Sequence, residues 1–508
     1  MPLPRYARAA AVEPAAAPAA IHITSSTIMH QVYRLSMAVE PRVVDTRRSG
    51  IRPLWVGNLR VRPLAGILVI LALAVNGGAQ APSAEEQQQL FSVLPLIDRG
   101  ELSQAEEQLA AGIERYPRST ILYNALGIVF RKGNKLDRAA DSFRKALEIL
   151  PSFTAAQLQL ASIDQQQGMK QDAARLFRAA GESTTNFEAL MAAGLGLADC
   201  EDYAGAAQVL EKARAMRPDS GSVTYNLALA QFKMGDLAAA LKTLDSIHVS
   251  EPDVVYLRGR VLKGLGKAEG GSEFAAACRA QPGNESFCAD AALATIRQQK
   301  FLDAVALLEP AVEKSPGSVA LLPLLGLAQF RLGRYQEAIR SYAGSLDKDP
   351  SLDASREGLG FLYYVTGDLE KARAVVEQGL TNPKADFYLA YLDAIILYRL
   401  SPQSRFHATA AAERAIQANT RFAPAYFQRG KIRMEQNDSA GALADFERAA
   451  ELDPKYPLPY YKMAQIYARQ GRARDAEAAR RKFSALGNLR EEEMLTRQTL
   501  DVLMPAPR

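Results

Sequence analysis

Residues 321–350 have the sequence LLPLLGLAQFRLGRYQEAIRSYAGSLDKDP, which contains the complete repeating pattern of the chain. It contains two apolar segments of about 12–15 residues with helical periodicity, one on each side of Gly333. A glycine at that place suits the left-handed residue that often follows a helix, and Pro350 ends the second segment because proline cannot donate the helical hydrogen bond. The stretch therefore predicts two helices joined by a short turn.

The same pattern recurs about every 34 residues along the chain. Small residues recur at three equivalent positions of the repeat, here called columns. The second column lies twelve positions upstream of the first, and the third lies seven positions downstream of it. The first column, early in the second helical segment of each unit, contains twelve residues at steps of 31 to 36: Ala105, Ala139, Ala173, Ala206, Ala240, Gly271, Ala304, Ala338, Ala372, Ala408, Ala442 and Ala476.

Small side chains in these columns allow neighbouring helices to approach closely, and large ones such as Phe143, Tyr342 and Phe446 fill the remaining space. No single unit can bury its apolar face alone, so stability must come from stacking. The sequence therefore predicts an all-α superhelical solenoid of about twelve helix-turn-helix repeats over residues 80–487. A charged C-terminal capping helix and tail are expected within residues 488–508.

Three segments carry a family resemblance. They are Tyr225-Asn226-Leu227-Ala228 with Gly235-Asp236 and Ala240, Leu325-Gly326 with Gly333-Arg334-Tyr335 and Ala338, and Gly430 with Ala442, Phe446 and Pro454. In these motifs the chain resembles the tetratricopeptide repeat (TPR) family over roughly residues 86–487. The resemblance implies that the first helix of each repeat lines a concave groove, along which a protein partner or an extended peptide lies.

Aromatic and basic residues are projected into this groove, and such residues dominate binding hot spots. Alternatively, about half of the aromatic side chains pack between adjacent first helices. Asparagine occurs at only one of six positions where a carboxylate clamp needs asparagine and basic residues to recur, which argues against that clamp. The predicted groove residues are Tyr225, Phe232, Lys233, Tyr256, Arg260, Lys263, Arg297, Phe330, Arg331, Phe361 and Tyr364, followed by Phe427, Lys431 and Tyr461.

The repeats leave little chain for a catalytic domain, and no Walker loop, nucleophile elbow or His-Glu-x-x-His motif is present. Only His248 and His407 follow the leader, so no metal site or cofactor is expected. Cys278 and Cys288 flank the turn at residues 281–284. They either form a disulfide or are two small buried residues that replace alanine.

Residues 1–79 contain nine arginines and three acidic residues, a net charge of +6, so the rest of the chain carries −1 of the total +5. A nearly neutral body gives no electrostatic footprint for nucleic acid. Arg60 and Arg62 precede an apolar run at residues 64–75, and small residues follow at 77–81. This arrangement predicts a secretory signal cleaved after Ala79.

Residues 1–36 resemble no folded element, and Met37 is an alternative start. If the apolar run at residues 64–75 is not cleaved, it is expected to anchor the protein to the membrane. Otherwise the protein is exported, periplasmic or secreted. Its expected role is that of a non-catalytic scaffold in an envelope or secretion assembly. The alternative role is an accessory subunit that binds a glycan or a catalytic partner in polysaccharide export.

Overall fold

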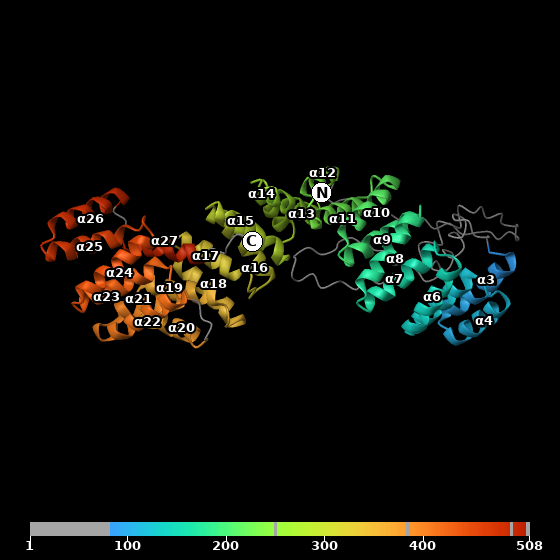
Figure 1. Ribbon diagram of the computed structural model, residues 1–508, viewed down its shortest axis with the longest axis horizontal. Helices are drawn as coiled ribbons and strands as arrows, with labels where there is room; N and C mark the ends of the chain where they lie inside the picture. Colours follow the sequence, from blue (N-terminus) through green and yellow to red (C-terminus); the bar gives the residue numbers. More distant parts are fainter. Residues whose placement is uncertain (1–81, 248–250, 383–386, 488–490, 504–508) are drawn as a thin grey trace, which may run out of the picture. The chain divides into compact units, whose positions relative to one another are not determined.

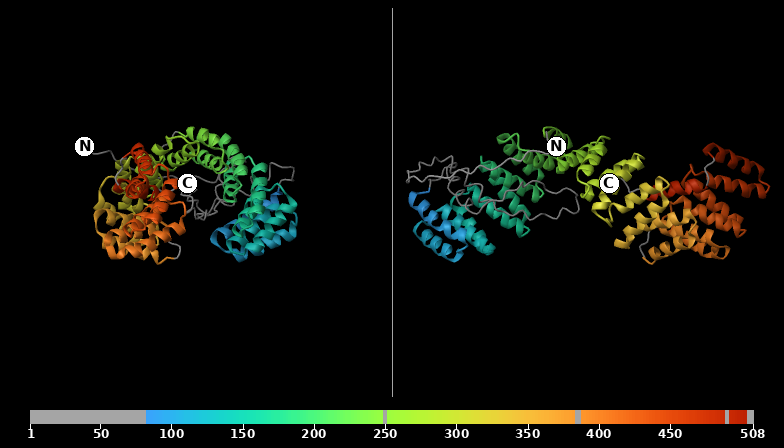
Figure 2. Two further views of the ribbon diagram at one scale, coloured as in Figure 1. Left: turned by 60° about the vertical axis from the view of Figure 1, so that its left-hand side comes forward. Right: turned by 180° about the vertical axis from the view of Figure 1, so that it is seen from behind.

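The computed structural model describes residues 82–247, 251–382, 387–487 and 491–503. Within these ranges the chain forms 25 α-helices and one 3-10 helix, and it forms no strand. It divides into two compact units, residues 1–249 and residues 250–508. In each unit the helices follow one another as hairpins in chain order (Figures 1 and 2). The predicted all-α repeat fold is confirmed.

Ten helices belong to the described part of unit 1. They are α3 (Ala84–Arg99), α4 (Leu102–Arg115), α5 (Thr120–Lys132), α6 (Leu136–Ile149), α7 (Thr154–Gln166), α8 (Lys170–Ser183), α9 (Phe187–Asp199), α10 (Tyr203–Met216), α11 (Gly221–Lys233) and α12 (Leu237–Asp245).

Unit 2 contains the remaining fifteen α-helices and the 3-10 helix η3 (Pro402–Ser404). The α-helices are α13 (Pro252–Gly264), α14 (Gly270–Ala280), α15 (Glu285–Arg297), α16 (Phe301–Lys314), α17 (Leu322–Arg331), α18 (Tyr335–Lys348), α19 (Asp353–Thr366), α20 (Leu369–Leu380), α21 (Phe387–Leu400), α22 (Arg405–Ala418), α23 (Ala423–Glu435), α24 (Ser439–Leu452), α25 (Pro457–Arg469), α26 (Ala473–Leu486) and α27 (Glu491–Leu503).

Helices α3 to α26 form twelve consecutive hairpins in the described chain, which matches the predicted number of repeats. Within each unit, each of these helices packs against the next one, and several first helices of neighbouring hairpins also touch. In unit 2 these first-helix contacts join α15 to α17, α17 to α19, α19 to α21 and α21 to α23. The first helices from α15 to α23 therefore form one continuous layer in unit 2.

The small-residue columns lie where the helices of a hairpin meet. All eleven alanines of the first column are at most 2% exposed. A Cβ atom added at Gly127 of the second column would lie 2.5 Å from Cε1 of Phe143, and one at Gly430 would lie 2.7 Å from Cε1 of Phe446. Glycine is required at these places because the ring on the second helix fills the space beside its backbone.

The sixth hairpin differs from the predicted register by one residue. Gly271 is only half-buried, whereas Gly270 is buried, and a Cβ atom added to Gly270 would lie 2.8 Å from the carbonyl oxygen of Gly259. Phe274 is the large residue of this hairpin, four positions after Gly270, as Phe143 follows Ala139. The first column therefore passes through Gly270, eleven rather than twelve positions after Gly259 of the second column.

The turn inside most hairpins contains one residue in the left-handed conformation. The predicted glycines adopt it, with φ +73° at Gly333 and +85° at Gly367. Glu201 and Gln299 adopt the same conformation, with φ +67° and +59°, although left-handed φ values are unfavourable for residues with a Cβ atom. Turn geometry is thus kept even where glycine is absent.

The C-terminal helix α27 is present, but its position differs from that of a cap on the last repeat. It contacts α19. Its buried Met494 packs in a cluster with Phe427 of α23 and Tyr456, which precedes α25. Thr499 accepts a hydrogen bond from the hydroxyl of Tyr388 on α21. Helix α27 therefore lies against the first helices α19, α21 and α23.

The predicted leader, residues 1–79, with its apolar run at 64–75, lies outside the described residues, as does His248. Among the helices in the described ranges, none combines the length and the apolar character needed to cross a bilayer.

Candidate binding surface

The predicted groove residues fall on the first helices of both units. Tyr225, Phe232 and Lys233 lie on α11 of unit 1, and the others lie on α13 to α25 of unit 2. The exposed or half-buried ones are Phe232, Lys233, Arg260, Lys263, Arg297, Arg331, Tyr364, Lys431 and Tyr461. The buried ones, at most 5% exposed, are Tyr225, Tyr256, Phe330, Phe361 and Phe427. Their contact with a partner stays a prediction.

Tyr256 shows how a buried member of this set is held. Its ring stacks on Phe287 with a centroid distance of 4.4 Å and meets Phe274 at 5.5 Å. Its hydroxyl donates a 2.6 Å hydrogen bond to Asp290. Burial, together with the Asp290 carboxylate, raises the pKa of Tyr256. This side chain therefore joins neighbouring helices, as the alternative interpretation of the aromatic residues expected.

Seven residues from α17, α19, α21 and α23 form a connected line, here called the inner row. Phe330 meets Phe361 edge to face at 5.7 Å, and Phe361 meets Tyr364 at 6.3 Å. The inner row consists of Phe330, Phe361, Tyr364, Tyr398, Arg399, Phe427 and Lys431. It thus combines aromatic rings with cationic groups along four consecutive first helices.

The two cations of the inner row are held against aromatic faces. The guanidinium of Arg399 lies 5.2 Å from the Tyr364 ring centroid and donates a 3.3 Å hydrogen bond to the Tyr364 carbonyl. The ammonium of Lys431 lies 4.5 Å from the Tyr398 centroid and 5.9 Å from that of Phe427. These contacts fix two positive charges on a largely apolar face.

A cavity of about 90 Å³ opens between the inner row and α27. Its lining includes Arg399 and Lys431, and no aspartate or glutamate is among the described residues that line it. Gln428 also lines it, is 3% exposed, and its Nε2 makes no hydrogen bond with any described group. The cavity is therefore lined by aromatic rings together with the donor side chains of Arg399, Gln428 and Lys431.

Several residues of this surface were absent from the predicted set. Tyr391, Tyr398 and Arg399 come from α21, whose hairpin has isoleucine at the second small column and the irregular connection η3. Their signal in the sequence is the run of aromatic residues from Phe387 to Tyr398. Leu495 and Gln498 of α27 complete the cavity, and no repeat pattern covers them.

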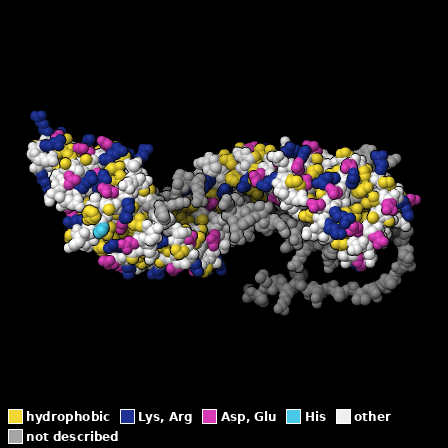
Figure 3. All heavy atoms as spheres, turned by 60° about the horizontal axis from the view of Figure 1, so that its bottom comes forward, with side chains coloured by type: hydrophobic (Ala, Val, Ile, Leu, Met, Phe, Trp, Pro, Cys, Tyr) yellow, Lys and Arg dark blue, Asp and Glu magenta, His cyan; other side chains and the backbone are white. Residues whose placement is uncertain are grey.

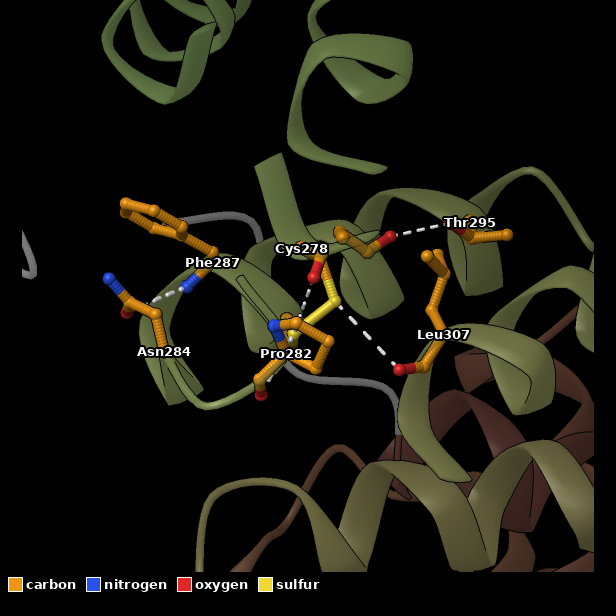
Figure 4. The surroundings of a disulfide bond; sticks show 8 residues. Cys278, Pro282, Asn284, Phe287, Thr295 and Leu307 are labelled. Carbon is orange, nitrogen blue, oxygen red and sulfur yellow. Dashed lines mark hydrogen bonds between the residues drawn. A yellow bond between two sulfur atoms is a disulfide. The ribbon is translucent and has the colours of Figure 1, made fainter. Parts of the chain in front are cut away.

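Cys278 of α14 and Cys288 of α15 are joined by a disulfide in the structure, with the sulfur atoms 2.11 Å apart (Figure 4). Both are at most 1% exposed. Formation of the bridge in the isolated protein stays a prediction. Cys200 is a free, half-buried thiol, and burial, followed by the charge of Asp199, raises its pKa to about 11. A thiol of this kind is a poor nucleophile at neutral pH.

Basic and acidic side chains are interspersed over the described atoms of the face shown in Figure 3. Exposed ion pairs on the described surface include Lys170 with Glu201, Arg144 with Asp141, and Lys371 with Asp368. Pairs of this kind contribute little to stability, but they leave no large single-sign field on this face.

The fold and the small-residue packing define a helical-repeat protein whose first helices carry an aromatic and basic surface. The chain matches the family described as "TPR repeat" at residues 430–471. It matches "Tetratricopeptide repeat" at residues 96–152, 197–259 and 289–353. The chain is a tetratricopeptide repeat protein. The presence of these repeats supports a role in binding a protein or a peptide.

Among curated proteins, the chain is 28% identical over 221 residues to the BBSome complex member BBS4 of Bos taurus. The match covers 37% of this chain and 42% of that protein, so it spans less than half of the relative's length.

Several solved structures are similar to parts of the chain at low sequence identity. The Naa15/Naa10 complex bound to HypK-THB gives a TM-score of 0.40 at 15% identity, covering 79% of this chain and 68% of that chain. The APC/C hetero-tetramer Cut9-Hcn1 gives 0.36 at 11%, covering 83% and 92%. YrrB, described as a TPR protein with an unusual peptide-binding site, gives 0.30 at 19%, covering 38% and 97%.

Proposed function

We propose that the chain is a non-catalytic scaffold that binds a protein partner along the first helices of unit 2. The inner row carries the proposal, because it places Arg399 and Lys431 on aromatic faces beside a cavity lined by donor groups. Aromatic rings and guanidinium groups are the anchors that contribute most to protein interfaces. Membership in the tetratricopeptide repeat family supports the same class of role.

The described residues offer little material for a reaction. No group of three or more His, Cys, Asp or Glu among them could hold a metal ion. His407 is exposed near the start of α22, and the free thiol of Cys200 has a raised pKa. We therefore assign no catalytic residue and no cofactor, and we propose that any chemistry belongs to a partner.

The sequence of the leader, residues 1–79, is the basis on which we also propose export. We propose cleavage after Ala79 and a periplasmic or secreted location, where the protein takes part in an envelope or secretion assembly. A glycan or a catalytic subunit as the ligand is the alternative. The mass of the purified protein tests cleavage: a chain that begins at Gln80 supports it, and a chain that retains residues 37–79 contradicts cleavage and favours the membrane-anchored alternative.

Partner binding is tested by charge reversal on the inner row. Partners that co-purify with the unaltered chain are quantified by mass spectrometry beside those of an Arg399→Glu, Lys431→Glu chain. The matched control reverses Arg340 and Lys348, which are exposed on α18. Loss of a stoichiometric partner by about tenfold or more in the first variant alone supports the proposal. Equal recovery from both variants contradicts it.

A further inference from the structure

A second cavity, of about 480 Å³, lies in unit 1. Its described lining comes from α6, α7 and α8 and from the two connections beside α7: Arg144, Leu147, Pro151, Gln157, Asp164, Met169, Asp172, Arg175, Leu176 and Ala179. A volume of this size is typical of sites that hold small ligands or single side chains of a partner. No residue of the inner row lies in unit 1, so this cavity is separate from the surface described above.

Asp164 of α7 occupies a position that is apolar in other repeats of unit 1. It lies nine residues before Ala173 of the first column. The equivalent residues of three other hairpins are Leu96, Phe130 and Leu197, which are at most 7% exposed. Asp164 is 5% exposed. One repeat of unit 1 therefore buries a carboxylic acid where its neighbours bury an apolar side chain.

Polar residues at this position of other hairpins have a polar partner twelve residues further on, in the second helix of the same hairpin. The hydrogen-bonded pairs are Thr243 donating to Gln231 at 2.8 Å, Ser341 donating to Gln329 at 2.7 Å, and Arg433 donating to Asp445 at 3.0 Å. Twelve residues after Asp164 the chain has Leu176, which has no donor in its side chain. Oδ1 of Asp164 is buried and accepts no hydrogen bond from any described group.

The two arginines of the cavity are engaged with other carboxylates. Arg144 donates a 2.7 Å hydrogen bond to Asp141, and Arg175 donates one to Asp172, each partner lying three residues earlier on the same helix. Burial raises the pKa of Asp164, although the charges of Arg144 and Arg175 act in the opposite direction. Both arginine charges are thus matched, whereas Oδ1 of Asp164 has no partner in the described chain.

The other polar side chain at the base of the cavity is also satisfied. Nε2 of Gln157 donates a 2.7 Å hydrogen bond to the carbonyl of Pro151, and its Oε1 accepts a 3.2 Å hydrogen bond from Ser183. The remaining lining is apolar: Leu147, Pro151, Met169, Leu176 and Ala179. Because a buried acceptor without a donor is destabilising and rare, Asp164 calls for a donor from outside the chain.

We propose that this cavity of unit 1 binds an organic cation, whose ammonium or guanidinium group donates to Oδ1 of Asp164 while an apolar stem packs on Leu147, Leu176 and Ala179. A free amine and a basic side chain of a partner protein share this chemistry. The inference does not rest on the proposed function, since it concerns the other unit and a different set of helices.

The test compares charged probes with neutral probes of the same shape, by calorimetric titration of the full chain. The free probes are butylguanidinium and butylurea. The peptide probes are Ala-Ala-Arg-Ala-Ala with blocked ends and the same peptide with citrulline, whose side chain ends in a urea group, in place of arginine. In at least one of the two pairs, the guanidinium probe should bind about tenfold or more tightly than the urea probe, because only the cation forms a charge-assisted hydrogen bond with Asp164.

Three variants locate the effect. Asp164→Asn should abolish the preference for the cation, and the matched control Asp219→Asn, at an exposed position of unit 1 outside the cavity lining, should retain it. Ala179→Trp leaves Asp164 in place but fills the cavity, so it should weaken binding of the guanidinium probe by about tenfold or more. Circular dichroism verifies that each variant keeps its helices.

The pair of probes that shows the preference identifies the source of the cation. A preference within the peptide pair supports a basic side chain of a partner, and a preference within the free pair alone supports a small amine. Equal affinities within both pairs, or no binding of any probe, would overturn the inference. A preference that survives in the Asp164→Asn chain or in the Ala179→Trp chain would also overturn it, since the cation would then lie elsewhere.

Discussion

The phenol hydroxyl of Tyr256 donates a 2.6 Å hydrogen bond to Oδ2 of Asp290, thirty-four residues further along the chain. Tyr256 lies on α13 and Asp290 on α15, so the bond joins the first helices of consecutive hairpins. Both residues stand one repeat length apart, at positions where a solenoid brings neighbouring units into contact. The hydrogen bond between Tyr256 and Asp290 thus shows that residues one 34-residue period apart come into contact when the repeats stack.

Replacing Tyr256 by phenylalanine should lower the free energy of unfolding by about 1–3 kcal/mol, because the bond to a carboxylate is lost and the ring stays. Urea-induced unfolding, followed by circular dichroism, measures this change. Tyr461, which is 42% exposed, provides the matched Tyr→Phe control, with an expected change below about 0.5 kcal/mol. Equal changes in the two variants would show that the hydrogen bond does not support stacking.

The contribution of Tyr256 and Asp290 to the free energy of unfolding should decrease at high pH. Because the pKa of Tyr256 is raised in the folded chain, its contribution to stability is complete below the ordinary tyrosine pKa of about 10 and is lost as the pH rises further. The stability of the original chain should therefore fall more steeply above about pH 10 than that of the Tyr256→Phe chain. Parallel curves would contradict this assignment.

Close helix contact at the second small column predicts the effect of one added methyl group. Alanine at Gly127 would place Cβ 2.5 Å from Cε1 of Phe143, so the ring or the helix must move. The free energy of unfolding should fall by about 1–3 kcal/mol. Alanine at Gly221, where no atom lies within 4 Å, should leave it unchanged or raise it by up to about 1 kcal/mol. Thermal and urea unfolding distinguish the two variants.

Thiol counting tests the Cys278–Cys288 bridge. The unreduced protein, once unfolded, should react through Cys200 alone, and three reactive thiols would exclude the disulfide. Because the bridge closes a loop with a sequence separation of 10, reduction should lower stability by about 2–3 kcal/mol. A chain with Cys278→Ala and Cys288→Ala should show no such dependence on a reducing agent.

The folded protein should alkylate slowly at Cys200. With a pKa of about 11, roughly one thiol in a thousand is ionised at pH 8, against about one in four for an ordinary cysteine. The rate with iodoacetamide should therefore rise about tenfold per pH unit up to about pH 10. A rate that levels off near pH 8.5 would contradict the effect of burial on this thiol.

The local features of the fold were predictable from the sequence, because they depend on residues within one hairpin. Alanines at a fixed step, a glycine opposite a large side chain, and glycine in the turn each report a nearby contact. The sixth hairpin was placed one residue out of register because Gly270 and Gly271 are both small. Only the close approach to Gly259 distinguishes them.

The candidate surface was predicted only in part, since burial and distant contacts decide it. The expectation that first helices line a groove included Phe330, Phe361 and Tyr364, but it does not say which rings pack against each other. The position of α27 depends on contacts such as that between Tyr388 and Thr499, separated by 111 residues. No repeat pattern encodes such a contact, and α27 follows no 34-residue period.

Photocrosslinking in cells tests whether a partner binds along the first helices of unit 2. A photoreactive residue replaces Arg399, which is exposed beside the cavity, or Arg340, which is exposed on the second helix α18. Irradiation in the producing cells, followed by mass spectrometry, identifies the captured proteins. We predict a discrete protein adduct from position 399 and none from position 340. Equal adducts from both positions, or an adduct from position 340 alone, would contradict the account.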